Sequence, residues 1–452
     1  TASPSSCAFI CGEVLRCRRA LKERFPGTPQ TDAGEGSCKD ARKNASRKNL
    51  RANDVDEDDA AAERRVLASL EYVLLECRQG IFVSFIQGMP RLVAVMACED
   101  YESPFALKTD LRQYRAQKAL ERPDIQLEPP WVEPQRFWAS HGILCNVPHK
   151  DGFSAAMVPE FLNLLRAAAA HHPHAWLEPS FDFFLNRRDC PLFPSDPTQH
   201  PYAFVGPSCR LRRPPPERPL PALSLYVGRA WNDYAMVEAL PWPQATAVAW
   251  RNKKKQALFR GSSTGRGTTP STNVRLALCA YSERDPRVDA GVTSWSSRDK
   301  CTGNDEITFQ PRLWDVKPAI PIAQWSAYKF LLYAEGYSAA LRLGPMLSTG
   351  SCIVWVYLEG HETSANEMWY YADLRVCEFT GAASWGDSLA AQNAAVIRCS
   401  VARLKDVLDF LCAHDAVAEA LGRRAREVFD ELQATRVQRT RDVLRAASGG
   451  RF

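Results

Sequence analysis

The segment between Phe259 and Thr269 combines glycine, hydroxyl and arginine side chains in an order that could bind a phosphate group. Arg260, Gly261 and Ser262 stand at its start, and Arg275 follows in a predicted helix. Glycine lets the backbone approach a ligand closely, hydroxyl groups donate hydrogen bonds, and a helix N-terminus favours negative charge. No Gly-Lys-Ser or Gly-Lys-Thr sequence follows, so the segment is not a P-loop. A surface turn of the same composition is the alternative interpretation.

A second candidate for anion binding lies between Gly336 and Arg342. Small residues, among them Gly336 and Ser338, follow an apolar run and allow tight packing or the approach of a ligand. An arginine about one turn into the following helix, Arg342, could bind an anion through two parallel hydrogen bonds. The alternative is a solvated surface arginine.

The third candidate is a polar segment that follows the apolar strand predicted at Phe181–Leu185. Asn186, Arg188 and Asp189 stand directly after this strand, and Pro191 ends the segment. Polar groups just past the carboxyl end of a parallel strand line the crevice in which α/β proteins bind ligands. Asp189 could therefore act as a general base, or it could only form an ion pair with a neighbouring arginine.

The elements that must position these residues alternate between strand and helix in the second half of the chain, which is typical of a parallel sheet covered by helices. The expected strands are 257–260, the apolar run 330–333, and 352–357. The expected helices are 271–282, one that begins at 339–343 and stops at Gly344 and Pro345, and two amphipathic ones within the last 45 or so residues.

The first half is expected to contain a helix from Ala60 to Cys77, then a hairpin of strands Ile81–Ile86 and Arg91–Met96. Residues 104–120 and 154–170 also show helical patterns. The proline cluster at 214–221 predicts an extended loop near a domain boundary. The predicted organisation is a polar N-terminal segment, 1–60, followed by two domains, 61–235 and 236–452.

The composition of the chain argues against a nucleic-acid-binding protein and against a membrane-spanning one. The 452 residues are 45% hydrophobic and 24% charged, with a net charge of +5, which is ordinary for a globular protein and too weakly basic to argue for nucleic acid. No apolar run is long enough for a transmembrane helix.

We expect no metal site, because the acidic run Asp54–Asp59 suits a helix N-terminus better than a metal. The 15 cysteines suggest buried thiols, with a few disulfides as the alternative. Neither a signal peptide nor an endoplasmic-reticulum retention signal is recognised, so the compartment stays open.

The three candidate segments together resemble motifs of glycosyltransferase family 90, the protein O-glucosyltransferases and capsule xylosyltransferases. The matching positions, in order, are Asp182, Asn186, Arg188, Asp189, Pro191, the segment from Asn232 to Trp242, Trp250, Lys253–Lys255, Phe259–Ser262, Arg275, Tyr328–Leu331, Gly336, Ser338, Arg342, 348–355, Glu367 and Trp369. The likeness spans roughly 178–432. The family's His-Tyr pair is missing at 375–379, and Val274 stands where an acidic residue is common.

The resemblance implies a GT-B fold, in which two Rossmann-like domains face a cleft and a long helical segment ends the chain. It implies an inverting, metal-independent transferase that moves glucose or xylose from a UDP-sugar to a protein or glycan hydroxyl and needs no other cofactor. Arg260, Ser262, Arg275 and Arg342 would bind the leaving diphosphate, and Asp189 would be the base, held by Asn186 or Arg188. Trp250, Phe259 and Trp355 could stack on the uracil or the sugar, or belong to the core.

Three other functions remain open. A phosphotransferase would need a pair of metal-binding acids near the glycine-rich segment, and Asp285 and Asp289 are the nearby candidates. A nucleic-acid-binding protein would use the basic runs 210–213 and 251–255. A degenerate glycosyltransferase would bind the nucleotide sugar without catalysis. The acceptor, the sugar and the oligomeric state are not determined by the sequence.

Overall fold

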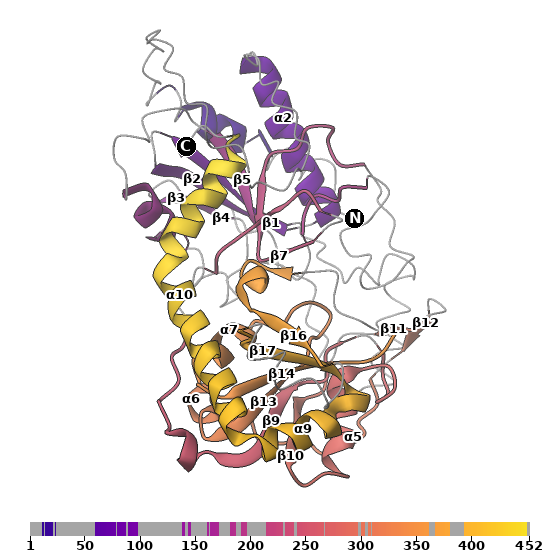
Figure 1. The fold of residues 1–452 in the computed structure, drawn as a ribbon. Coiled ribbons are helices and arrows are strands. Elements are labelled where there is room, and N and C mark those ends of the chain that lie inside the picture. Colours follow the sequence, from indigo (N-terminus) through magenta and orange to yellow (C-terminus); the bar gives the residue numbers. More distant parts are fainter. Residues whose placement is uncertain are drawn as a thin grey trace.

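Two large β-sheets, one of seven strands and one of six, organise the computed structural model of the chain (Figure 1). The expected mixed α/β class is confirmed. The structure describes residues 11–12, 14–20, 23, 59–77, 79–86, 89–97, 138–140, 143–145, 161, 163–170, 181–186, 191–196, 214–228, 231–238, 242–265, 267–296, 300–302, 306–308, 310–360, 367–379 and 393–449. The predicted helix 104–120 and most of the segment 1–60 lie outside these residues.

The seven-stranded sheet has the order β3-β4-β2-β1-β5-β6-β8 and mixes parallel with antiparallel pairs. Its strands are β1 (Gln79–Ile86), β2 (Met89–Ala97), β3 (Trp138–Ser140), β4 (Ile143–Cys145), β5 (Phe181–Asn186), β6 (Ala222–Ser224) and β8 (Tyr234–Ala235). The predicted hairpin is confirmed as β1 and β2, although β2 begins earlier than expected and contains Pro90. Proline is tolerated there because the register shifts beside it, between Ser84 and Phe85.

Strand β5 lies at the centre of this first core. All six of its residues are buried, as its composition predicts, but it pairs antiparallel with β1 and parallel with β6, so the expected parallel environment is only half right. Its one carboxylate, Asp182, accepts hydrogen bonds from Ser84 Oγ at 2.7 Å and Arg18 Nε at 2.7 Å. These two bonds compensate for the burial of the charge.

Helix α2 (Asp59–Tyr72) packs on this sheet and continues into a π-helical turn, η1 (Val73–Cys77). It matches the helix predicted from 60 to 77, and Asp59 at its first position fits the preference of acidic residues for a helix N-terminus. Leu70 and Val73 pack with Phe82 and Phe184 of the sheet. The described part of the helix predicted at 154–170 covers residue 161 and residues 163–170.

The six-stranded sheet is entirely parallel and has the order β10-β9-β13-β14-β17-β16. Its strands are β9 (Lys254–Ser262), β10 (Val288–Ser294), β13 (Tyr328–Tyr333), β14 (Cys352–Tyr357), β16 (Val376–Glu378) and β17 (Val396–Ser400). The three predicted strands are confirmed as β9, β13 and β14. The chain runs outward from β9 to β10 and returns on the other side of β9 with β13, so the topological switch point lies between β9 and β13.

Helices cover both faces of this sheet. Helix α5 (Val274–Ser282), η6 (Val401–Arg403) and α9 (Leu404–Ala413) lie on one face, and α7 (Leu343–Leu347) with most of α10 (Asp415–Ala447) lies on the other. The shorter elements are η3 (Trp250–Asn252), α6 (Ile322–Trp325), η4 (Tyr371–Asp373), and the strand pair β11 (Lys300–Thr302) and β12 (Glu306–Thr308). The predicted helices at 271–282 and near the C-terminus are confirmed.

The helix expected to begin at 339–343 and to stop at Gly344 and Pro345 is wrong in its position. Helix α7 instead begins at Leu343, so Gly344 and Pro345 lie in its first turn and Arg342 is its N-cap. Proline fits a first helical turn because the N–H group that it lacks would have no helical partner there.

The chain passes from one sheet to the other after β8, and the proline-rich segment 214–221 leads into β6 of the first sheet. Two further connections join the sheets. Strand β7 (Tyr226–Val227) pairs antiparallel with β15 (Glu367–Met368). Helix α10, yellow in Figure 1, runs from the six-stranded sheet to the seven-stranded one and contacts both β14 and β8.

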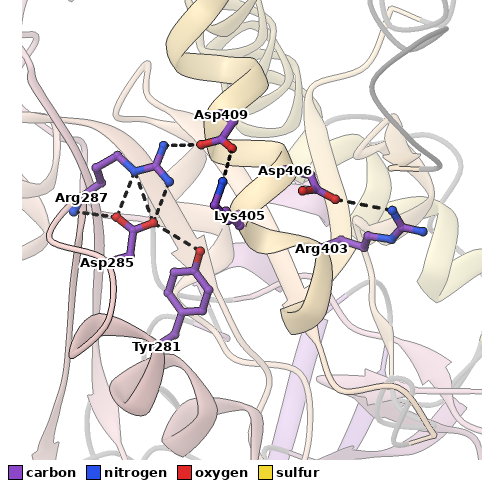
Figure 2. A network of polar contacts seen from close by, with 7 residues as sticks. All are labelled: Tyr281, Asp285, Arg287, Arg403, Lys405, Asp406 and Asp409. Atoms are coloured by element: carbon purple, nitrogen blue, oxygen red, sulfur yellow. Dashed lines mark hydrogen bonds and ion pairs between the residues drawn. The ribbon is translucent and has the colours of Figure 1, made fainter.

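A network of charged side chains ties the end of α5 to α9 (Figure 2). Asp285 accepts from Arg287 Nη2 at 2.7 Å, and Nη1 of the same arginine donates to Asp409 at 2.7 Å. Asp409 also accepts from Lys405 at 2.6 Å. The hydrogen bonds from Arg287 lower the pKa of Asp285. The network fixes the turn between α5 and β10 against a helix more than 100 residues further along the chain.

Candidate anion-binding site

The loop after β9 and the loop after β13 meet at the switch point of the parallel sheet. The β9 loop turns through Gly265 and Gly267, which have φ of 134° and 76°. Glycine adopts this backbone conformation without strain. Asn273 then caps α5 by accepting from the backbone N–H of Arg275 at 3.0 Å, and its amide donates to the Ser263 carbonyl at 3.2 Å. The first turn of α5 is thus fixed beside the loop, an arrangement that leaves an anion site at this helix N-terminus possible in geometry.

Arg275 clamps the two loops together. Its Nη1 donates to the Ser262 carbonyl at 3.1 Å and to Oγ1 of Thr264, both in the β9 loop. Its Nε donates to the Glu335 carbonyl at 3.0 Å and its Nη2 to the Ala334 carbonyl at 3.3 Å, both after β13. Only 3% of Arg275 is exposed. Most of its donors are therefore used to hold the protein, and little of its surface remains for a ligand.

Arg342 lies beside this clamp and is partly exposed. Its Nη1 donates to the Arg260 carbonyl, and its guanidinium lies 5.7 Å from the centre of the Phe259 ring. A Cβ added at Gly261 would lie 2.6 Å from Nη1 of Arg342, so the guanidinium would have to move from its present position. Gly336 has a similar function, because a Cβ there would lie 3.0 Å from Nη2 of Arg275. The two glycines that the sequence singled out thus lie directly against the two guanidinium groups.

The two guanidinium groups place like charges side by side in a poorly hydrated part of the protein. Burial lowers the pKa of Arg275 to about 9, and the charge of Arg342 acts in the same direction. Burial also lowers the pKa of Arg342. Both groups nevertheless stay charged at neutral pH. Within the described residues, the groups that accept their hydrogen bonds are carbonyl and hydroxyl oxygens rather than carboxylates.

An acidic and aromatic edge borders the arginines. The Glu335 carboxylate accepts from the Tyr371 hydroxyl at 3.1 Å, and Tyr371 lies 2.8 Å from the hydroxyl of Tyr333. Ser338, which is 7% exposed, accepts from the backbone N–H of Gly336 at 3.0 Å through its carbonyl. Sequence reasoning missed Glu335, although its place directly before Gly336 at a strand end was a signal. Tyr371 carried no such signal, because only the tertiary fold brings it here.

The guanidinium of Arg260 is directed elsewhere. Its Nη2 forms an ion pair with Asp289 at 2.7 Å, and Lys317 binds the same carboxylate at 2.9 Å. Arg260 thus contributes its carbonyl to the site, as the acceptor for Arg342. Asp285 and Asp289, considered above as metal-binding acids, are both ion-paired with basic side chains.

The third candidate segment is described only at its two ends. Asn186 is 1% exposed at the end of β5 and donates to Ser224 Oγ at 2.8 Å. Ser224 donates in turn to Asp233, which also accepts from the backbone N–H of Leu192 at 2.7 Å. Arg188 and Asp189 lie outside the described residues. Both flanks of their segment are therefore fixed by one buried polar network in the first half.

The aromatic candidates for stacking are core residues. Phe259 is 1% exposed, and Trp355 is enclosed by Tyr333 and Tyr371 with both ring centroids at 5.2 Å. Trp250 donates to Asp415 at 3.0 Å and is 9% exposed. Phe259 and Trp355 therefore belong to the core beside the site, and Trp250 lies before the start of β9, at the opposite end of that strand from the site.

The basic run at 251–255 is not wholly a charged surface. Lys253 is 5% exposed and donates to the Ser326 carbonyl at 2.7 Å, the Thr349 carbonyl at 2.9 Å and Ser351 Oγ at 3.0 Å. Burial lowers its pKa to about 8. The other basic run, 210–213, lies outside the described residues.

Several described cysteines are buried free thiols. Burial raises the pKa of Cys279 to about 11 and that of Cys399 to about 12. Among the described residues no group of three or more metal-ligating side chains occurs. None of the helices in the described part of the chain is long and apolar enough to cross a bilayer.

No protein-family model matches the chain. It is similar to three viral proteins. The uncharacterized protein 035R of Invertebrate iridescent virus 3 is 31% identical over 216 residues, which cover 42% of this chain and 19% of that protein. The uncharacterized protein 027R of Frog virus 3 is 33% identical over 212 residues, or 39% of this chain and 22% of that protein. The uncharacterized protein 179R of Invertebrate iridescent virus 6 is 24% identical over 250 residues. The chain thus spans about a fifth of the length of these relatives.

Proposed function

We propose that the chain is an inverting glycosyltransferase that uses a UDP-sugar and resembles glycosyltransferase family 90. One observation carries the proposal. At the switch point of a parallel sheet, a partly exposed arginine, Arg342, is held beside a buried one, Arg275, and their described partners are neutral oxygens. Two adjacent cations that donate to no described carboxylate, in a crevice of the kind that binds ligands in open α/β sheets, favour an anionic group there. The nearby Glu335 carboxylate offsets only part of their charge, because the pKa of Arg275 stays lowered. A diphosphate fits this description.

In this proposal the chemistry is divided between the two arginines and the first half. Arg342 binds the leaving diphosphate, and the backbone N–H groups at the start of α5 add further donors. Hydrogen bonds to charged groups of this kind contribute about 1.5–3 kcal/mol each, and they strengthen as negative charge develops on the leaving group. Arg275, Gly261, Ser262, Gly336 and Ser338 shape the loops around the anion. Asp189 accepts the proton of the acceptor hydroxyl as that oxygen attacks the sugar.

The two halves then have different tasks in a GT-B arrangement. Residues 236–452 form the donor side, which contains the parallel sheet and both arginines. Residues 61–235 form the acceptor side, and Asn186 and Arg188 position Asp189 there. Glucose or xylose is the donor sugar, and a protein or glycan hydroxyl is the acceptor. Neither a metal nor another cofactor is required.

The release of UDP tests this reaction directly. Glycosyl donors are hydrolysed slowly when water replaces the acceptor, so we expect UDP release from UDP-glucose or UDP-xylose, measured by chromatography, with and without EDTA. Arg342→Ala should reduce the rate by roughly 10²-fold, as expected for the loss of one charge-stabilising donor. Arg423→Ala, a surface change on α10, is the control. Equal rates in both variants would contradict the proposal.

A catalytically degenerate protein that only binds the nucleotide sugar is the second candidate, and Asp189 distinguishes it from an enzyme. Removal of a general base costs about 10²–10⁴-fold in rate, so Asp189→Asn should abolish measurable UDP release while it leaves the binding of UDP unchanged. A variant with the rate of the wild type would show that Asp189 is not the base. A basic nucleic-acid-binding protein is disfavoured, because Lys253 of its basic run is buried and bonded to three oxygens.

A further inference from the structure

The connection between the two sheets holds both ends of the short helix α7. Trp242 belongs to this connection, between β8 and β9, and lies against the first turn of α7. A Cβ added at Gly344 would lie 2.3 Å from the indole ring, so the contact requires glycine. Three residues later, the backbone N–H of Ala245 donates to Oγ of Ser348, the C-cap of α7, at 3.0 Å.

Trp242 is itself fixed from the opposite side. Its ring stacks on Trp369 at 5.8 Å and meets the edge of Tyr370 at 4.9 Å. Its indole N–H donates to the carboxylate of Glu238, and the main-chain carbonyl of Glu238 accepts from Arg436 of α10. The ring therefore cannot move without disturbing the connection, the segment at 369–370 and α10.

Arg342 is the N-cap of the helix that Trp242 supports. The Arg342 carbonyl accepts from the backbone N–H of Met346 at 3.0 Å, which joins it directly to the first turn of α7. Its guanidinium also lies directly over Gly261, where an added Cβ would come within 2.6 Å of Nη1. A small shift of α7 would therefore displace the guanidinium from the anion site.

We infer that Trp242 is a positioning residue for Arg342, so that the segment joining the two halves sets the geometry of the anion site. The identity of the ligand, UDP, rests on the proposed function. The mechanical link between Trp242 and α7 does not depend on it. It also implies that the nucleotide, when bound at Arg342, stabilises the connection between the halves, because coupling between two sites acts in both directions.

Calorimetric titration of UDP and uridine into Trp242→Phe tests the inference. We expect Trp242→Phe to lower the affinity for UDP about tenfold, within the range of coupling between residues linked by contacts. The affinity for uridine, which has no phosphate, should stay unchanged. When Arg342 is already replaced by alanine, Trp242→Phe should not lower the affinity for UDP any further. Trp250→Phe, at a tryptophan that is also buried at 9% exposure and that donates to Asp415, lies in the core on the other face of the sheet from α7 and should leave the affinity for UDP unchanged.

Equal weakening of UDP and uridine, or equal effects with and without Arg342, would overturn the inference. Amide hydrogen exchange of residues 343–349 without ligand gives a second reading. Exchange should accelerate in Trp242→Phe and not in Trp250→Phe, and unchanged exchange in Trp242→Phe would overturn the link. If the wild type binds no UDP, the proposed function fails and exchange alone decides the inference. If Trp242→Phe does not fold, Ser348→Ala loosens the other end of the same contact and is measured in its place.

Discussion

At the scale of single residues, the two arginines of the site have different tasks. Arg275 bridges Ser262 and Thr264 on one loop to Ala334 and Glu335 on the other, whereas Arg342 is partly exposed. The sequence selected both arginines from their places after predicted strands. It could not distinguish their tasks, because the carbonyl group of Glu335, 60 residues after Arg275, reaches the guanidinium only through the folding of the second loop against the first.

The clamp predicts that Arg275→Lys is destabilising even though the charge is kept. A lysine has one nitrogen and cannot reach oxygens of both loops, so several buried carbonyl groups lose their partners. We expect a loss of roughly 2–3 kcal/mol in the free energy of unfolding, measured by urea denaturation. Lys405→Arg is the control, because it makes the reverse substitution at an exposed position on α9. If Arg275→Lys unfolded at the same urea concentration as the wild type, the claim that Arg275 holds the two loops together would be contradicted.

Glu238 predicts a pH dependence of stability. Burial raises its pKa to about 7 from 4.5, against the opposing effects of the Trp242 hydrogen bond and the Arg436 charge. The folded state therefore binds this proton more tightly than the unfolded state does. Stability should fall as the pH rises from 4.5 to about 7, and this contribution should stay constant above that range.

Replacement of the Glu238 carboxyl group by an amide removes the cost of burying a negative charge at this position. Glu238→Gln should unfold at a higher temperature than the wild type at pH 8, by an amount equivalent to at most roughly 3 kcal/mol, and at nearly the same temperature at pH 5. Glu419→Gln, an exposed site on α10, should change neither value. A variant that is less stable than the wild type at pH 8 would show that the carboxylate is needed in its charged form.

At the scale of elements, the charged network between α5 and α9 should contribute a small, salt-dependent term. The side chain of Arg287 is 32% exposed, and surface ion pairs typically contribute up to about 1 kcal/mol. Arg287→Ala should therefore lower the free energy of unfolding by about 0.5–1 kcal/mol at low salt and by less at 1 M salt. Because the pKa of Asp285 is lowered, the difference should also shrink as the pH falls below 3.8, its usual value.

A double-mutant cycle with Asp409→Ala checks that the effect belongs to the link between α5 and α9. The two losses should not add, because they remove the same ion pair. Additive losses would show that each residue acts separately.

Several of the larger elements of the second half could be predicted from local pattern, whereas strands β10, β16 and β17 of the parallel sheet were not predicted. Strand β14 coincides with the predicted 352–357, and the apolar faces of α9 and α10 are buried as expected. The start of α7 could not be predicted in this way, because Gly344 and Pro345 usually end a helix. Here Gly344 is required by the approach of Trp242, which lies about 100 residues earlier in the chain.

At the scale of the whole molecule, the pairing of strands depends on contacts that no local pattern encodes. The composition of Phe181–Leu185 predicted burial correctly, but the antiparallel pairing with β1 follows from the hairpin that precedes it. The switch point between β9 and β13 arises from the strand order alone. This order brings together the two glycine-containing segments that the sequence treated as separate candidates.

Thermal unfolding in the presence of nucleotides shows whether Arg342 belongs to a nucleotide-binding site. The purified chain and its Arg342→Ala and Arg423→Ala variants would be unfolded with UDP, UDP-glucose, UDP-xylose, GDP and ATP, without added metal. A ligand present at 100 times its dissociation constant stabilises the native state by about 2.7 kcal/mol, or roughly 3 °C when a chain of this size unfolds as one unit. We expect such a shift with UDP or a UDP-sugar in the wild type and Arg423→Ala, and none in Arg342→Ala. No shift with any nucleotide at millimolar concentration, or an equal shift in Arg342→Ala, would contradict the account.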